Sequence, residues 1–270
     1  MSQGFHVVVC GGLVPDPLQS LEPIETPTGP GIKNEAMLPS VLDPWAAHAL
    51  YEAAHLARNT EGTRVWLVSL GPKARLQQLM MSVAQKVPFE LVALDGPAHG
   101  FTDPFEVAAA LAGAIEGIPE LDRSRLLLFG GCASASRDAG VTLPMVGERL
   151  GITDHFLGAD ALSVQEDGSL RLKERIEGGC YRVSECDGPP MLVAWATGSL
   201  PEPVNNPQVG MQNMRAIMPA LAKAAPAALG ADGVAFAKVE RPTQRRETRV
   251  VKDRPVEEVA REIVDWIQEG

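Results

Sequence analysis

The sequence predicts an α/β fold built on a mainly parallel sheet, and three observations indicate it. Runs rich in apolar residues at 5–10, 64–70 and 126–129 are typical of strands buried on both faces. Segments with apolar side chains at helical spacing separate these runs, so strands and helices alternate along the chain. The connections are long enough for crossovers, which favours parallel strands joined in the right-handed sense.

The first strand is expected to end at two glycines, residues 11–12, before a long excursion that extends to residue 39. The excursion is rich in Pro, Gly and Thr and has little periodicity. Asp43 is a candidate N-cap with Pro44 at the first helical position, and the spacing of apolar residues predicts a helix after it. Further strands are expected at 64–70 and 90–94, each followed by a helix; Asp103 is the expected cap of the second of these helices.

The stretch 126–150 organises the rest of the chain. Its strand is expected to end in a turn at Gly130 and Gly131, followed by a loop of small and hydroxyl-bearing residues and a helix over 143–150. Close backbone approach, amide donors and a helix start are what a phosphate group needs. A Gly-Gly pair is also an ordinary way to leave a sheet, so a plain strand-to-helix connection is the alternative.

Three strand ends of this kind occur, at residues 10–12, 69–71 and 130–131. The carboxyl ends of parallel strands meet at one edge of a sheet, and ligands bind there where the strand order reverses. The convergence favours a nucleotide site at this edge.

From residue 160 onward the pattern changes to short alternating segments. Residues 161–164, 170–176 and 181–186 predict antiparallel strands at one edge of the sheet, and residues 191–196 predict a strand that returns to it.

The last part of the chain has few large apolar residues until its final segment. There Val256, Val259, Ile263 and Trp266 lie on one face of a predicted helix, which must pack against something. We therefore expect an α/β domain at 1–198 and an extended arm at 199–270 that ends in a helix and wraps a partner subunit. The alternative is that the arm folds back on its own domain.

Composition excludes several classes of protein. With 270 residues, of which 45% are hydrophobic, the chain can bury a sizeable core, and its net charge of −10 argues against binding nucleic acid. The one cluster of Lys and Arg, at 241–254, is interrupted by acidic residues. No apolar stretch approaches the ~20 residues that span a bilayer and no signal peptide is evident, so we expect a cytoplasmic protein without membrane insertion. The four cysteines lack the spacing of a metal site or a disulfide framework.

No catalytic motif is present. The five histidines stand apart, and Ser134 and Ser136 have no evident histidine or aspartate partner in the sequence. Any redox chemistry would therefore need a cofactor.

Six short motifs follow one another along the chain. They are Val14-Pro15-Asp16, Asp43-Pro44-Trp45 with Glu52-Ala53, Ser69-Leu70-Gly71-Pro72, the loop from Gly130 to Thr142, Glu174-Arg175 with Gly178-Gly179, and Asn206-Pro207-Gln208 with Met211. In this order and with these gaps, they resemble the motifs of the beta subunit of an electron transfer flavoprotein over nearly the whole chain.

The resemblance implies a Rossmann-like adenine-nucleotide-binding domain in a heterodimer with a larger alpha subunit. FAD would be shared with the alpha subunit, with its isoalloxazine near Trp45, and the family holds an AMP, or a second FAD in bifurcating members, inside the beta subunit. Electrons would pass from a dehydrogenase to an acceptor such as a quinone reductase, so the chain would be an electron carrier and not itself an enzyme. By position, the cofactor contacts fall on Cys10, Asp43, Pro44, Trp45, Ala46, Leu70, Gly130, Gly131, Cys132, Ala133, Ser134, Ala135, Ser136, Arg137, Asp138, Ala139, Gly140 and Val141. The contacts with the dehydrogenase fall on Pro207, Gln208, Met211 and Met214.

The chain departs from the family pattern at the nucleotide loop, where residues 135–138 replace an Asp-rich core. Arg137 can pair with a phosphate, or the site can have lost its nucleotide; the missing Asp-Gly-Asp-Thr run argues against a second FAD. The Met-rich segment 211–218 suits an adaptable partner surface, and filling a core is the alternative. Two other interpretations stay open: a stand-alone adenine-nucleotide-binding module of the stress-protein kind, and a structural subunit with an empty nucleotide site.

Overall fold

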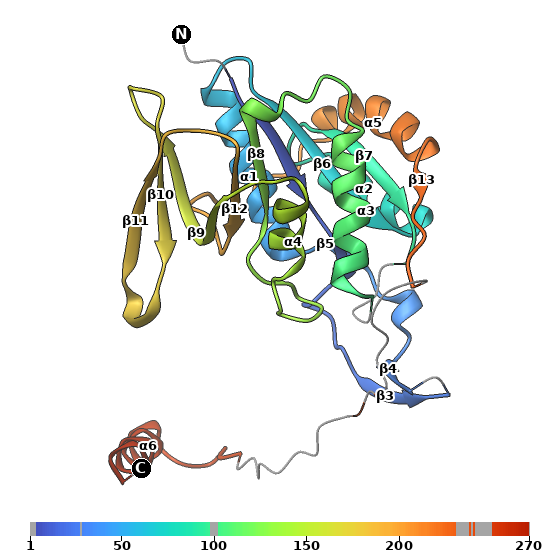
Figure 1. Cartoon of the computed structure of the whole chain (residues 1–270). Coiled ribbons are helices and arrows are strands. Elements are labelled where there is room, and N and C mark those ends of the chain that lie inside the picture. Colours follow the sequence, from blue (N-terminus) through green and yellow to red (C-terminus); the bar gives the residue numbers. More distant parts are fainter. Residues whose placement is uncertain are drawn as a thin grey trace.

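A nine-stranded sheet forms the centre of the molecule, with helices on both of its faces (Figure 1). The structure is a computed structural model that describes residues 4–27, 29–97, 102–230, 238, 240 and 250–269. The strand order is β11-β10-β9-β12-β8-β1-β6-β7-β13. The strands are β1 (His6–Cys10), β6 (Arg64–Gly71), β7 (Glu90–Asp95), β8 (Leu126–Gly131), β9 (Asp154–Val164), β10 (Leu170–Arg175), β11 (Tyr181–Cys186), β12 (Met191–Trp195) and β13 (Ala225–Pro226).

The predicted α/β class with a mostly parallel sheet is confirmed. All neighbours from β9 to β13 pair in parallel, whereas β10 pairs antiparallel with both β9 and β11, which gives the predicted antiparallel edge. Strand β9 begins at Asp154, earlier than the alternation at 161–164 predicts. Its first half pairs with β12 inside the sheet, where alternation of polar and apolar residues is not required.

Two hydrophobic cores cover the two faces of the sheet. Helices α1 (Pro44–Asn59), α2 (Lys73–Val83) and α5 (Pro207–Ala222) pack on one face, and α3 (Pro104–Glu116) and α4 (Thr142–Arg149) pack on the other. Successive residues of β1 alternate between the cores: Val7 and Val9 belong to the first and Val8 to the second, all fully buried. Apolar runs of this kind are therefore buried on both sides, as the sequence predicts.

Two predicted helix starts are confirmed. Asp43 and Asp103 are the N-caps of α1 and α3, each followed by proline at the first helical position. Each carboxylate accepts a hydrogen bond from the backbone N–H two residues on, Trp45 or Phe105.

The excursion at 17–39 and the residues on either side of it contain more structure than their composition predicts. Strand β2 (Leu13–Pro15) pairs with β5 (Ser40–Leu42), and β3 (Pro23–Thr26) pairs with β4 (Gly29–Ile32) in a hairpin that projects from the body (Figure 1). The first ladder contains three buried residues, Leu13, Val14 and Leu42. Its two strands are short and flanked by proline, so the sequence pattern did not reveal them. The ladder brings the chain back to the start of α1.

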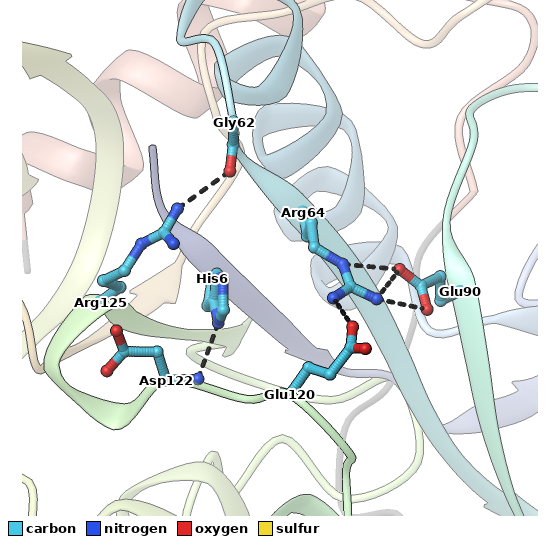
Figure 2. Close-up of polar contacts among 7 residues, drawn as sticks. All are labelled: His6, Gly62, Arg64, Glu90, Glu120, Asp122 and Arg125. Atoms are coloured by element: carbon cyan, nitrogen blue, oxygen red, sulfur yellow. Dashed lines mark hydrogen bonds and ion pairs between the residues drawn. The ribbon is translucent and has the colours of Figure 1, made fainter. Parts of the chain in front are cut away.

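A polar network lies at the end of the sheet where the parallel strands begin (Figure 2). The Arg64 guanidinium bonds Glu90 at 2.8 Å and Glu120 at 2.7 Å, and its carbon lies 4.6 Å from the Trp66 ring centroid. Nδ1 of His6 accepts a hydrogen bond of 2.8 Å from the backbone N–H of Asp122. The polar groups of these residues bond within the chain, so this end of the sheet has a structural role. Ligand sites are expected at the opposite end, where the parallel strands finish.

Beyond residue 198 the chain contributes further to the sheet and its cover. Helix α5 packs against α2 and β7, and β13 pairs with β7 at the edge of the sheet. Helix α6 (Val256–Glu269) stands apart from the sheet (Figure 1).

The division at residue 198 stays a prediction, and most of the basic run at 241–254 lies outside the described residues. Among the described residues, no helix is both long enough and apolar enough to cross a bilayer.

Candidate functional site

The candidate site lies at the carboxyl ends of β1 and β8, where the strand order reverses. The chain proceeds from β1 to β6 and β7 on one side, then returns to β8 on the other side of β1. In open α/β sheets the crevice for a ligand lies at such a point. Ser69 Oγ donates to the Gly11 carbonyl over 2.7 Å, which fixes the end of β1 to β6.

Gly130 and Gly131 belong to β8, so the predicted turn at these residues is wrong. Their partners in β12 are Ala194 and Trp195. A Cβ on Gly130 would lie 2.9 Å from Leu143, and one on Gly131 would lie 2.5 Å from the Cβ of Trp45. The two glycines are needed because α4 and the start of α1 press against the strand, not because the chain turns there.

Asp43 connects the start of α1 to the loop that follows β8. Its Oδ1 caps Trp45 N at 3.2 Å, while Oδ2 accepts hydrogen bonds from Ser134 Oγ at 2.8 Å and Ala135 N at 2.9 Å. The residue is only 5% exposed. Burial raises the pKa of this carboxyl above its ordinary value, against the hydrogen bonds from Ser134 and Ala135, which lower it.

The loop over residues 132–141 folds on itself. Asp138 N donates to the Ser134 carbonyl at 2.8 Å, Ser136 N donates to Ser134 Oγ at 3.2 Å, and the two serine hydroxyls lie 2.9 Å apart. Gly140 has φ 61°, and a Cβ there would lie 2.0 Å from the Cys132 carbonyl oxygen. Only glycine fits both constraints. Helix α4 then begins with Val141 as its N-cap, without a side-chain hydrogen bond.

The structure brings most of the sequence-predicted cofactor residues together. Asp43, Trp45 and Ala46 meet Gly131 and the loop through the contacts described above. The Cys10 carbonyl lies at Gly130, and the Cys10 side chain packs on the second core. The Leu70 side chain is buried in the same core. The remaining predicted residues lie at the same strand-end region, on α1 or in the loop: Pro44, Cys132, Ala133, Arg137, Ala139 and Val141.

Sequence reasoning missed an ion pair beside this loop. Arg175 bonds Asp160 at 2.8 Å and Thr197 Oγ1 at 3.0 Å, and Thr197 Oγ1 donates to Asp160 at 2.9 Å. Burial by itself raises the pKa of Asp160, but hydrogen bonds from Thr197 and Arg175 outweigh it and hold the pKa below its ordinary value. The charges of Asp160, Arg175 and Asp138 all act on the Cys132 thiol. The only sequence signal was Glu174-Arg175, which indicates a strand and not a pair with a distant aspartate.

Burial disfavours the thiolate form of both cysteines at the site. Burial raises the pKa of Cys10 to about 12 and also raises that of Cys132, so both thiols stay protonated at neutral pH. In the part of the chain that the structure describes, no three His, Cys, Asp or Glu side chains gather as a metal site would require.

A separate cavity of about 290 Å³ lies beside α1, on the face of β9 and β12. Its lining includes His55, Asn59, Ser163 and Trp195, none of which belongs to the strand-end loops. The indole nitrogen of Trp195 is buried without a hydrogen-bond partner, the one such side-chain atom found in the described residues. This cavity is not part of the candidate site.

The predicted partner-binding residues lie on α5. Asn206 caps the helix through Gln208 N at 3.0 Å, and Pro207 is its first residue. Met211 is 66% exposed, so its role as a partner contact stays a prediction, whereas Met214 packs against the first core, as the alternative predicts.

The platform for α5 is a further feature that sequence reasoning missed. Asn213 Nδ2 donates to the carbonyls of Ala84 at 2.7 Å and Val87 at 3.0 Å, and Asn206 N donates to Gln85 O at 2.8 Å. These carbonyls lie at the C-cap of α2 and in the three residues after it, so the segment that ends α2 positions the helix that carries the exposed methionine.

Comparison with known families identifies the class of protein. The model described as "Electron transfer flavoprotein domain" matches residues 33–228, and the chain belongs to this family. The domain is shared by the N-terminal part of alpha subunits and by beta subunits, and it is typical of electron-carrier subunits and not of catalytic enzymes. A search of curated proteins found no match.

The family's cofactors fit the site unequally. A half-buried Trp45 beside Gly131 offers an aromatic surface of the kind that a flavin ring contacts. A phosphate group needs hydrogen-bond donors. At the start of α1, Asp43 already accepts the hydrogen bonds of Trp45 N, Ser134 Oγ and Ala135 N. At this end the residues present do not fit the phosphate of an adenine nucleotide.

Proposed function

We propose that this chain is the beta subunit of a heterodimeric electron transfer flavoprotein. In this role it passes electrons from a dehydrogenase, through FAD shared with a larger alpha subunit, to a downstream acceptor such as a quinone reductase. The family membership supports an electron-carrier role. The order of the six sequence motifs supports the beta assignment, and the composition supports a cytoplasmic location.

The unpartnered helix α6 is the observation that carries the proposal. Val256 is 78% exposed, Trp266 75% and Ile267 68%, so this helix has no apolar surface to cover it in the described chain. An amphipathic helix of 14 residues is marginal in water alone and gains its stability by packing. The arm is therefore suited to wrap a partner subunit. A stand-alone nucleotide-binding module has no use for it.

The exposed face of α5 supports the docking of a second partner. Met211 projects from a helix whose other side is fixed to α2, so a flexible apolar side chain is presented on a rigid support. We propose that Pro207, Gln208 and Met211 contact the donor dehydrogenase, with Met214 supporting them from the core side.

Native isolation of the chain from its host tests the proposal. We expect a yellow one-to-one complex with a larger chain, whose visible absorbance is that of an oxidised flavin. A colourless chain with a bound adenine nucleotide would instead establish the stand-alone module, and a purified complex without flavin would refute the carrier role.

A further inference from the structure

The contacts of Asp43 differ from those of an ordinary helix cap. Asp103 begins α3 in the same Asp-Pro sequence and caps Phe105 N at 3.0 Å. Asp43 does the same for Trp45 with one oxygen, and with the other it accepts two donors from a loop 91 and 92 residues away. Its oxygens accept hydrogen bonds from Trp45 N, Ser134 Oγ and Ala135 N, and these favour the ionised carboxylate against burial, which raises its pKa.

These donors are what the site would offer to a phosphate. The start of a 16-residue helix carries partial positive charge, and Ser134 Oγ and Ala135 N belong to the loop expected to surround a nucleotide. An anion placed there would face the Asp43 carboxylate at close range and find its donors occupied.

The loop is also closed without a ligand. Gly131 touches Trp45, Gly140 touches Cys132, and the amides of Ala135, Ser136 and Asp138 all donate within the chain. Arg175, whose charge acts on Cys132 in this loop, already bonds Asp160.

We propose that the carboxylate of Asp43 takes the place of a nucleotide phosphate, so that the site is closed by the chain's own anion and binds no AMP. The inference rests on the proposed function in that it concerns the nucleotide site of that subunit. Asp43 is then the residue that decides nucleotide specificity: it selects against a phosphate while it keeps the loop in place for the flavin side of the site.

The test compares nucleotide binding in full-length chains that differ at one carboxylate. Asp43→Asn keeps an oxygen to cap Trp45 but loses the charge and one acceptor, and Asp43→Ser keeps only the cap. Asp103→Asn is the matched control at the other Asp-Pro start. Nucleotide released on denaturation is quantified per chain, and AMP and adenosine are titrated by calorimetry, with circular dichroism to verify folding.

We expect no stoichiometric AMP in the wild-type chain, and AMP binding there no tighter than adenosine binding. Asp43→Asn and Asp43→Ser should each bind AMP about tenfold or more tightly than the wild type, with adenosine unchanged and with no gain in Asp103→Asn. The inference is overturned by one AMP per wild-type chain, by tighter binding of AMP than of adenosine to the wild type, or by folded Asp43 variants that bind AMP no better.

The outcome separates this inference from the proposed function. A yellow complex that also contains stoichiometric AMP overturns the role of Asp43 and leaves the carrier function intact. A chain without flavin refutes the carrier function, while the AMP measurements still decide the role of Asp43.

Discussion

Glu52, in the middle of α1, accepts a hydrogen bond of 2.6 Å at Oε1 from the backbone N–H of Ser199. This bond joins α1 to the segment that leads into α5. Leu200 N bonds the same oxygen at 3.2 Å. Glu52 is buried, and Gly198, at φ 72°, passes so close that a Cβ would lie 2.7 Å from this oxygen.

Removing this acceptor should loosen the start of the arm. Glu52→Ala leaves two backbone N–H groups without their partner, and we expect a loss of about 1–3 kcal/mol in the free energy of unfolding. Urea denaturation measures it, with Glu116→Ala, an exposed residue of α3, as a control expected to change stability by less than about 0.5 kcal/mol. Equal effects of the two variants would contradict the role of Glu52.

Glu174 should depend on Arg182 for its burial in the antiparallel edge. Its carboxylate, 1% exposed, is bonded by Arg182 at 2.8 Å, by Ser184 and by Leu157 N. Arg182→Ala should cost about 1–3 kcal/mol of unfolding free energy, because a buried charge loses its counter-ion. Arg171→Ala, which removes a 3.8 Å pair exposed on the same two strands, should cost about 0–1 kcal/mol. Urea denaturation of the two variants measures both losses, and equal losses would contradict the dependence of Glu174 on Arg182.

Stability should fall in mild acid through His6. Burial, together with Arg125 and Arg64, lowers the pKa of His6 below 6.5, so the unfolded chain binds the proton more readily than the folded one. Unfolding free energy should therefore decrease as pH falls through 6.5 and stop decreasing below the folded pKa. His6→Asn should remove this part of the pH dependence and His55→Asn, an exposed residue of α1, should keep it, as denaturation at a series of pH values will show.

Substitutions on α6 should separate assembly from folding. Ile263→Glu and Trp266→Glu change exposed side chains, so the free energy of unfolding of the isolated chain should change by less than about 0.5 kcal/mol. Recovery of the flavin-containing complex should be lost, because a charge would be buried at the interface. Arg261→Gln, at a polar position of the same helix, should leave recovery unchanged. Normal recovery of both glutamate variants would contradict a partner on this face.

Electron transfer from the donor should depend on Met211. Met211→Glu should lower the rate of flavin reduction by the dehydrogenase about tenfold or more without lowering the melting temperature, since the side chain is exposed. Gln212→Glu adds the same charge one position away on an exposed site and is the control. If both variants lowered the rate equally, charge on α5 and not contact with Met211 would be responsible.

The sequence predicts those parts of the fold that depend on local patterns. Apolar runs identified the central strands, and Asp43 and Asp103 marked two helix starts, because burial on both faces and capping leave signals within a few residues. Gly130 and Gly131 were misplaced as a turn, because close packing and a turn both favour glycine and only the neighbours distinguish them.

At the candidate site, the sequence located the residues but not the contacts between them. Asp43 and Ser134 were both predicted, yet their hydrogen bond spans 91 residues, and a pattern of single positions contains no record of it. The ion pair of Asp160 and Arg175 was not predicted for the same reason, since each residue alone is typical of an edge strand.

The apolar face of α6, which no described residue covers, also bears on how the cell makes this protein. Copies of the chain produced in excess would expose Trp266 and Ile267, a surface of the kind that chaperones and proteases act on and that promotes aggregation. In the proposed heterodimer, balanced synthesis of the two subunits would therefore protect the chain as much as its own fold does.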